Sequence, residues 1–172
     1  YVNITAKNIS ARIWSVNLSD TEVKAGDTLD IEVVLEKYLG GMQTHSFEIK
    51  VPETLSPGEY KLMIMGGGAY QKFLQSTAPY KFVADGAQSL VDALNRTLAI
   101  KQDKLHCILM LPPEGIAIEQ AELPSLPATR AMILQDSKRM MRVQPYARWI
   151  GKSADTGLLT AEQQTFRITV IE

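Results

Sequence analysis

The sequence predicts a mainly β protein of the α+β class, and residues 29–64 carry most of that signal. Apolar and polar residues alternate in three consecutive runs, over residues 29–36, 46–51 and 60–64. A period of two places one set of side chains on a core face and the other toward water. Turn-forming residues, Gly40-Gly41 and Ser56-Pro57-Gly58, separate the runs. This arrangement is typical of an antiparallel sheet with one solvated face.

The segments on either side of these runs are less regular. Within residues 1–18 the alternation changes parity, which predicts a β-bulge or a strand that changes partner. Residues 20–26 are typical of a turn. Residues 66–86 begin with three glycines that end a strand, and their scattered aromatic residues predict a loop or short turns.

A helical period follows in residues 89–99. Ser89 and Asp92 occupy the positions of a capping box at the start of this segment. We expect one amphipathic helix that covers a sheet with its apolar face. The residues that share this face are Leu90, Val91, Leu94 and Leu98.

The last third of the sequence predicts several short elements. Residues 105–111 are apolar at odd and even positions, which indicates a strand buried on both faces, with the helix covering one of them. A Pro-rich turn leads from it into an Ile-rich strand at 116–118. Pro127 suits the first turn of a short helix at 128–135. Residues 142–150 and 165–171 are predicted as closing strands.

A change in composition near residues 66–85 predicts the domain organisation. Residues 1–66 are expected to form an Ig-like β-sandwich module, residues 67–86 a connector, and residues 87–172 a smaller α+β portion with the one main helix. Alternatively, the last strand returns to the first sheet and the two halves share one core.

Composition excludes several classes of protein. The net charge of −1 and the pI of about 6.2 give no overall attraction to nucleic acid or to an anionic membrane. No apolar run approaches the roughly 20 residues that span a bilayer. Because the sequence begins at Tyr1 without a signal segment, we expect a processed piece of a longer chain.

Two side-chain types carry weak signals of their own. Cys107 is the single cysteine, so no intrachain disulfide can form, and its apolar neighbours predict a buried and unreactive thiol. Each asparagine begins an Asn-x-Ser/Thr sequon, a pattern that suits glycosylation but also arises by chance in strands rich in Ser and Thr. These asparagines are Asn3, Asn8, Asn17 and Asn95.

The sequence offers little from which to build a catalytic or metal site. His45 and His106 are 61 positions apart and have no companions at metal-ligand spacing. His106 and Cys107 are adjacent in a predicted strand, so their side chains face opposite ways and cannot form a dyad. Phosphate-loop and dinucleotide-loop patterns are incomplete, at Tyr146 and Gln71 respectively. We therefore predict no enzymatic activity, no cofactor and no metal.

The distribution of charge is more informative. Residues 19–59 hold nine acidic residues against three lysines, whereas residues 130–152 hold six basic residues against Asp136 alone. Such a basic strip can bind a polyanion, or it can be solvated or dock on an acidic surface; we favour the latter and predict no nucleic-acid partner. The candidate interaction surface comprises this strip and the aromatic segment at 70–82, with Lys138, Arg139, Arg142, Arg148, Trp149, Lys152, Tyr70 and Tyr80 as its residues.

Three stretches resemble a known region. They are KAGDTLDIEVVL at 24–35 with LSPGEYKLMIMGGGA, the helix SLVDALNRTL with LPPEGIAIEQAELPSLPATRAMIL, and the closing FRITVIE. In this order they resemble the region that follows the SpoIVB-type serine peptidase domain in large exported bacterial proteins. The resemblance covers about residues 20–172, and its most specific part is the segment 122–127.

The resemblance implies a non-catalytic accessory module in the periplasm or outside the cell. Because no position matches the peptidase's serine motif, no catalytic residue carries over. The expected partner is the upstream domain of the same polypeptide or another protein. An alternative function is binding of carbohydrate or another envelope polymer, which requires exposed aromatic faces such as Tyr70, Tyr80 or Trp149 around a groove.

Overall fold

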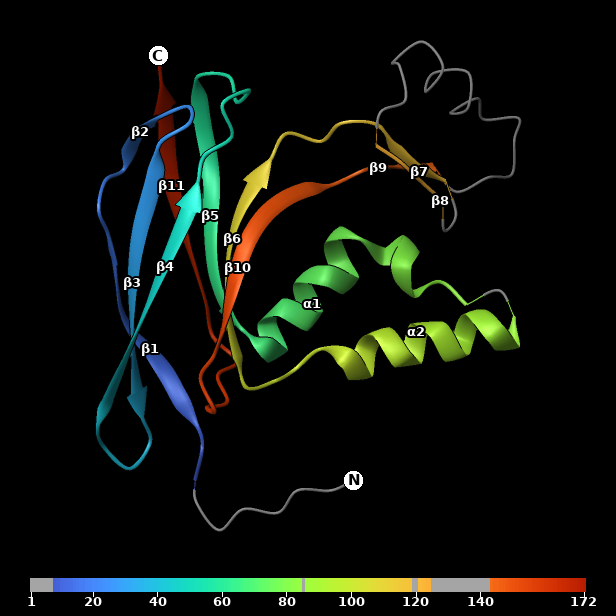
Figure 1. Ribbon diagram of the computed structural model, residues 1–172. Coiled ribbons are helices and arrows are strands. Elements are labelled where there is room, and N and C mark those ends of the chain that lie inside the picture. The colour runs from blue at the N-terminus through green and yellow to red at the C-terminus, as the bar shows by residue number, and fades with distance from the viewer. Residues whose placement is uncertain (1–7, 85, 119–120, 125–142) are drawn as a thin grey trace. The chain divides into compact units, whose positions relative to one another are not determined.

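The computed structural model describes residues 8–84, 86–118, 121–124 and 143–172 (Figure 1). The chain divides into two compact units that interleave along the sequence. The first comprises Tyr1–Tyr70, Lys101–Met110 and Ile150–Glu172, and the second comprises Gln71–Ile100 and Leu111–Trp149. The units are therefore discontinuous in sequence.

The predicted mainly β, α+β class is confirmed. In the described residues the strands form a three-stranded sheet in the order β1-β3-β4, a five-stranded sheet in the order β10-β6-β5-β11-β2, and a small sheet in the order β8-β7-β9. The strands are β1 (Ala11–Leu18), β2 (Glu22–Lys24), β3 (Thr28–Lys37), β4 (Met42–Lys50), β5 (Gly58–Gly66), β6 (Lys104–Leu111), β7 (Ile116–Ile118), β8 (Ala121–Leu123), β9 (Val143–Pro145), β10 (Arg148–Asp155) and β11 (Gln163–Ile171). The helices are α1 (Gly67–Thr77), α2 (Ala87–Ala99) and the 3-10 helix η1 (Pro79–Phe82).

The core of the first unit lies between its two sheets, which face each other in Figure 1. The predicted alternation is confirmed, because every second residue of β3 is buried and the residues between them are mostly exposed. The five-stranded sheet supplies the opposing apolar face from β5, β6 and β11. Buried side chains of this core include Leu29, Ile31, Val33, Leu35, Phe47, Ile49, Leu62, Ile64, Leu105, Leu109, Ile168 and Val170.

The β3–β4 hairpin closes as its glycines predict. The Lys37 amide donates to the Gly41 carbonyl at 3.0 Å, and the Gly40 amide donates to the Lys37 carbonyl at 3.0 Å. Gly40 and Gly41 have φ angles of 89° and 90°, which a residue with a side chain rarely adopts. The pairing then runs without interruption from Glu36↔Met42 to Thr28↔Lys50.

β5 does not extend this hairpin but enters the other sheet. It pairs antiparallel with β6 on one side and with β11 on the other. β11 also pairs parallel with β2, through Val170↔Val23. The prediction of a plain turn over residues 20–26 was therefore wrong, because Glu22–Lys24 forms a short strand at the edge of the five-stranded sheet. The closing strand predicted at 165–171 is confirmed.

The predicted irregularity near the N-terminus is a β-bulge. Ile13 pairs with Leu35 and Ser15 pairs with Val34, so Trp14 is the extra residue. Ile13 is buried against the core, whereas Trp14 is 54% exposed. Alternation from Ile13 places Trp14 on the exposed side of β1 with Arg12, and the bulge reverses the alternation beyond it, so that the half-buried Val16 and Leu18 share a parity with Trp14.

The expected loop at 66–86 was wrong in its first half, where α1 forms. Tyr70 of α1 stacks on His106 of β6, with ring centroids 3.8 Å apart and an interplanar angle of 17°. The strand β6 is buried as predicted. The side chain that covers β6 at His106 is Tyr70 of α1, and not one from the helix predicted at residues 89–99.

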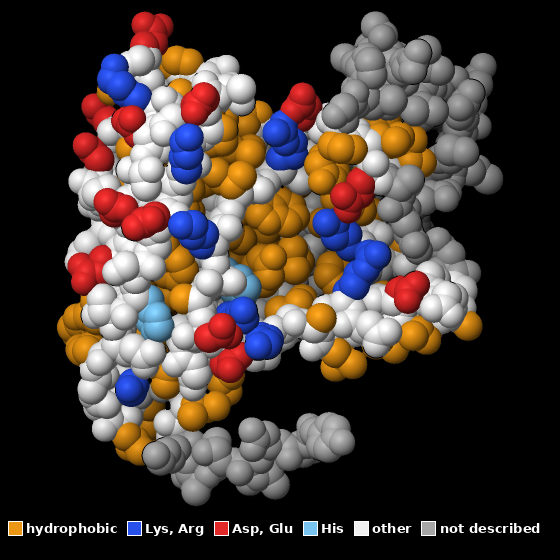
Figure 2. All heavy atoms as spheres, in the orientation of Figure 1, with side chains coloured by type: hydrophobic (Ala, Val, Ile, Leu, Met, Phe, Trp, Pro, Cys, Tyr) orange, Lys and Arg blue, Asp and Glu red, His pale blue; other side chains and the backbone are white. Residues whose placement is uncertain are grey.

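The helix predicted from its period is confirmed as α2, but its apolar face is not buried. Its cap also differs from the prediction, because the Gly86 amide donates to Ser89 Oγ at 2.9 Å and Asp92 takes no part. Ala93 is the buried residue of α2. Figure 2 shows hydrophobic side chains along the lower edge of this helix. Their exposed fractions are 50% for Leu90, 49% for Val91, 53% for Leu94 and 81% for Leu98.

The second unit contains a smaller core. Tyr80 of η1 packs with Ala78 and Ala117 of β7, and Tyr146 and Trp149 lie against them. The strand predicted at 142–150 is divided, since β9 ends at Pro145 and β10 begins at Arg148. The short helix predicted at 128–135 lies outside the described residues.

Replacing Gly66 with alanine should strongly destabilise the first unit. A Cβ atom at Gly66 would lie 1.9 Å from the Thr160 carbonyl oxygen, so the backbone itself would have to move. We expect Gly66→Ala to lower the free energy of unfolding by about 3 kcal/mol. Urea denaturation followed by circular dichroism measures this change. Gly86→Ala is the control, because its Cβ meets no atom within 4 Å; equal effects would contradict the structure.

Truncating the apolar face of α2 should cost little. Because Leu98 is 81% exposed, Leu98→Ala should change the free energy of unfolding by less than about 0.5 kcal/mol. The buried Leu62 gives the comparison, with a loss of about 2–5 kcal/mol expected for Leu62→Ala. A core-sized loss for Leu98→Ala in thermal or urea denaturation would mean that this face of α2 is buried.

Candidate functional site

The basic strip predicted from the sequence is only partly described. Lys138, Arg139 and Arg142 lie outside the described residues. Arg148 forms an ion pair with Glu114, and Lys152 is exposed in the middle of β10. One of the two described cations of this strip is thus neutralised within the second unit.

The predicted aromatic residues do not share one surface. Tyr80 is 2% exposed, so its ring cannot serve as a contact surface, and burial followed by the charge of Glu122 raises its pKa to about 12. Trp149 is partly buried and meets Phe73 edge-on, with centroids 5.4 Å apart. Tyr70 is half-buried against His106. The aromatic groove that the carbohydrate alternative required at these positions is therefore not formed by them.

The titratable residues of β6 do not form a reactive site. Burial raises the pKa of Cys107 to about 12, which confirms the prediction of a buried, unreactive thiol. Burial, followed by the charge of Lys104, lowers the pKa of His106 to about 4. Over the described residues, no group of three or more His, Cys, Asp or Glu side chains is arranged to hold a metal.

A different surface has the features of a binding site. Large side chains gather where β1 meets the end of the β3–β4 hairpin, and the Tyr38 amide donates to the Ser10 carbonyl at 3.0 Å there. Leu159 joins them, since its amide donates to the Ile9 carbonyl at 2.8 Å. We call this the Arg12 surface; it comprises Ser10, Arg12, Trp14, Glu36, Lys37, Tyr38, Leu39, Met42 and Leu159.

Arg12 is the centre of the Arg12 surface. It lies opposite Glu36 in the β1–β3 pairing, and its Nε donates to Glu36 Oε2 as an ion pair. The Arg12 guanidinium carbon lies 5.0 Å from the centroid of the Trp14 ring, within the range of a cation–π contact. One arginine therefore holds a carboxylate and an indole in place.

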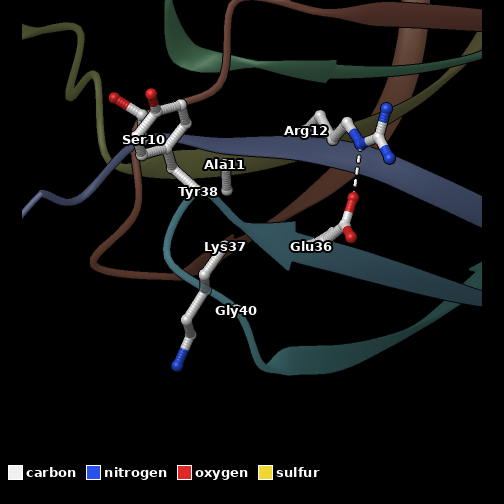
Figure 3. Close-up of a pocket in the computed structure, with 7 residues that line it drawn as sticks. All are labelled: Ser10, Ala11, Arg12, Glu36, Lys37, Tyr38 and Gly40. Atoms are coloured by element: carbon white, nitrogen blue, oxygen red, sulfur yellow. Dashed lines mark hydrogen bonds and ion pairs between the residues drawn. The ribbon is translucent and has the colours of Figure 1, made fainter.

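A groove opens on each side of Arg12. The first has a volume of about 470 Å³, and in Figure 3 Tyr38 and Lys37 point in opposite directions from the strand end that borders it. The second has a volume of about 460 Å³. The first is lined by Ser10, Ala11, Arg12, Glu36, Lys37, Tyr38 and Gly40, and the second by Arg12, Ile13, Trp14, Glu162, Gln163 and Gln164.

The apolar members of the Arg12 surface are well exposed. Tyr38 is 72%, Leu39 79%, Met42 53% and Leu159 40% exposed. These residues were not among those predicted from the sequence, although two signals were present. The parity change in residues 1–18 marks the bulge at Trp14, and the apolar pair Tyr38-Leu39 stands where a polar hairpin turn is usual.

The comparisons with known proteins add no further guide to the site. The chain matches no protein-family model, no curated protein and no solved structure. Among the described helices, none is both long and apolar enough to cross a bilayer.

The stability of the first unit should depend on the protonation of His106. Its lowered pKa means that the unfolded chain takes up a proton below about pH 6.5, whereas the folded protein does so only near pH 4. Stability from this residue is thus present above pH 6.5 and lost as the pH falls toward 4. These pKa values correspond to about 2 kcal/mol between pH 7 and pH 5, and partial exposure of the ring reduces the effect. Wild type should therefore lose roughly 1 kcal/mol more than His106→Phe in urea denaturation over this range. Equal losses would refute a buried neutral imidazole.

Proposed function

We propose that the protein is a non-catalytic interaction module of an exported multidomain bacterial protein, and that its Arg12 surface contacts the partner. The observation that carries this proposal is the exposure of four large apolar side chains in one place, together with Trp14. Exposed apolar area costs about 25 cal/mol per Å² relative to burial. Exposed apolar side chains gathered around grooves are typical of protein interfaces.

The polar residues of the Arg12 surface support a specific contact. The pair Arg12–Glu36 is partly exposed, with side-chain exposures of 57% and 29%, and can exchange its ion pair for bonds to a partner. Aromatic residues and arginine dominate the binding energy of many interfaces. Trp14, Tyr38 and Arg12 provide these residue types around two grooves.

The resemblance to the region that follows SpoIVB-type serine peptidase domains gives the proposal its setting. The described residues begin at Asn8, beside the Arg12 surface, since the Ser10 carbonyl accepts a hydrogen bond from the Tyr38 amide. We propose that the upstream domain is the partner, and that the module lies in the periplasm or outside the cell. An Ig-like relationship of the β-sandwich belongs to the same proposal.

Binding of carbohydrate or an envelope polymer is the second candidate, and one observation favours it. Trp14 borders a groove whose other side chains include Glu162, Gln163 and Gln164. An aromatic ring beside hydrogen-bonding amides and a carboxylate suits stacking on a sugar. This position replaces Tyr70, Tyr80 and Trp149, which the sequence had suggested for the same role.

Removing the Trp14 side chain should test whether it contacts a partner or only supports the fold. Trp14→Ala should weaken binding of the upstream domain, measured by calorimetry, by about 30-fold or more, as for an interface hot spot. Leu98→Ala is the matched control, since Leu98 is also large, apolar and exposed, and it should bind as wild type does.

Two further results decide between the candidates. The coding sequence ahead of Tyr1 should specify a signal segment and a serine peptidase domain; a signal segment joined directly to Tyr1 would contradict the upstream-domain proposal. For the second candidate, Trp149→Phe leaves Trp14 as the single tryptophan. Quenching or a spectral shift of its fluorescence by peptidoglycan or chitin oligosaccharides would then support sugar binding.

A further inference from the structure

The outer edge of β4 presents an unpaired row of backbone groups. β4 is the last strand of its sheet in the described residues. The Lys37–Gly41 hydrogen bond fixes the pattern, so that odd-numbered residues of β4 bond to β3. The amides and carbonyls of the even-numbered residues therefore point away from the sheet. These residues are Met42, Thr44, Ser46, Glu48 and Lys50.

The other edges of the two large sheets are protected. Along β1, the Ile13 amide donates to Glu162 Oε2 at 2.7 Å, the Ile13 carbonyl accepts from Gln164 Nε2 at 3.4 Å, and the bulge at Trp14 interrupts the edge. β2 has three residues, and β10 carries the exposed Lys152. Short strands, bulges and lysines are the usual means of preventing strand addition. Residues 42–47 of β4 contain none of these features.

The outward face of the sheet beside this edge is acidic. Asp30 of β3 lies directly opposite Glu48 of β4, and Glu32 lies opposite Ser46. No ion pair neutralises these three carboxylates among the described residues, whereas Glu36 is paired with Arg12. Two like charges directly opposite each other destabilise a strand pair. Figure 2 shows acidic side chains gathered over this part of the molecule.

We propose that the β4 edge binds an extended basic peptide as an added strand. The peptide's backbone would bond to the amides and carbonyls of Thr44, Ser46 and Glu48, as in other cases of strand addition. A lysine or arginine opposite Glu48 would offset the repulsion from Asp30. A lysine or arginine opposite Ser46 would extend over the small serine side chain toward Glu32, whose strand lies two strand spacings, or ~9.6 Å, from the peptide.

The alternation of the strand also defines the peptide's other residues. Side chains between the basic positions would lie on the inner face, beside Phe47 and the half-buried His45. Apolar β-branched residues fit this position. The expected ligand is therefore a segment in which Lys or Arg alternates with Val, Ile or Thr. A second copy of the chain fits less well, since it would bring a second set of acidic residues to the same face.

The β4 edge is a separate site from the Arg12 surface that contains Trp14, although Met42 belongs to both. Trp14→Ala is therefore expected to leave peptide binding unchanged. Failure of the Arg12 surface as an interface would not affect the β4 edge, and the converse also holds.

Fluorescence anisotropy with a labelled peptide tests the proposal. The probe is a nine-residue peptide that alternates lysine with valine, acetylated and amidated at its ends. Ser46→Pro removes one outward amide without removing a bond to β3, and proline is tolerated at such edge positions. We expect Ser46→Pro to weaken binding about tenfold or more, whereas Ser46→Ala should bind as wild type does. Glu32→Lys with Glu48→Lys should also weaken binding and reduce its salt dependence.

A second measurement does not depend on the folding of the proline variant. The same peptide, methylated at alternate backbone nitrogens, cannot bond along the edge and should not bind wild type. The proposal is overturned if wild type does not bind the unmodified probe, or if the methylated probe binds equally well. Sedimentation of wild type as a dimer that Ser46→Pro converts to monomer would also overturn it, in favour of a second copy at this edge.

Discussion

The pairing of β5 with β11 is the constraint on which the first unit depends. It joins residues 163–170 to residues 58–65 in an uninterrupted antiparallel register. β11 in turn holds β2 at the sheet edge, and β5 holds β6 on its other side. The side chains that reach β1, Glu162 and Gln164, also lie at the start of β11. Both sheets of the sandwich are thus connected through one strand from the end of the chain.

The local elements of this fold could be predicted because their information is local. Alternation marks β3, β4, β5 and β11, and the glycines after Lys37 mark the hairpin. Strand partners could not be predicted in the same way, since the hydrophobic pattern of β5 is the same whether it continues the hairpin or crosses to the other sheet. A three-residue strand such as β2 leaves almost no periodic signal and forms because β11 lies beside it.

The candidate sites show the same difference between what the local sequence can predict and what it cannot. The aromatic residues near the basic strip were predicted to form a contact surface, but a ring can do so only where it is exposed. Tyr80 is instead buried against Ala78 and Ala117. Conversely, Trp14 lies on the exposed side of β1 beside Arg12, although its large apolar ring would suit a core position equally well. The apolar face of α2 is a further case. Its period correctly indicated a helix, but the period does not reveal whether other residues cover the apolar side.

The interleaving of the two units has a consequence for synthesis of the chain on the ribosome. The second unit is encoded in two segments, residues 71–100 and 111–149, which lie on either side of β6 and ahead of β11. Until residues 163–171 are made, β5 has no β11 to pair with, and the inner faces of β3 and β4 lack part of the sheet that covers them. Such exposed strands are prone to aggregate. The protein is therefore expected to rely on chaperones, or on slow translation, until its last ten residues emerge.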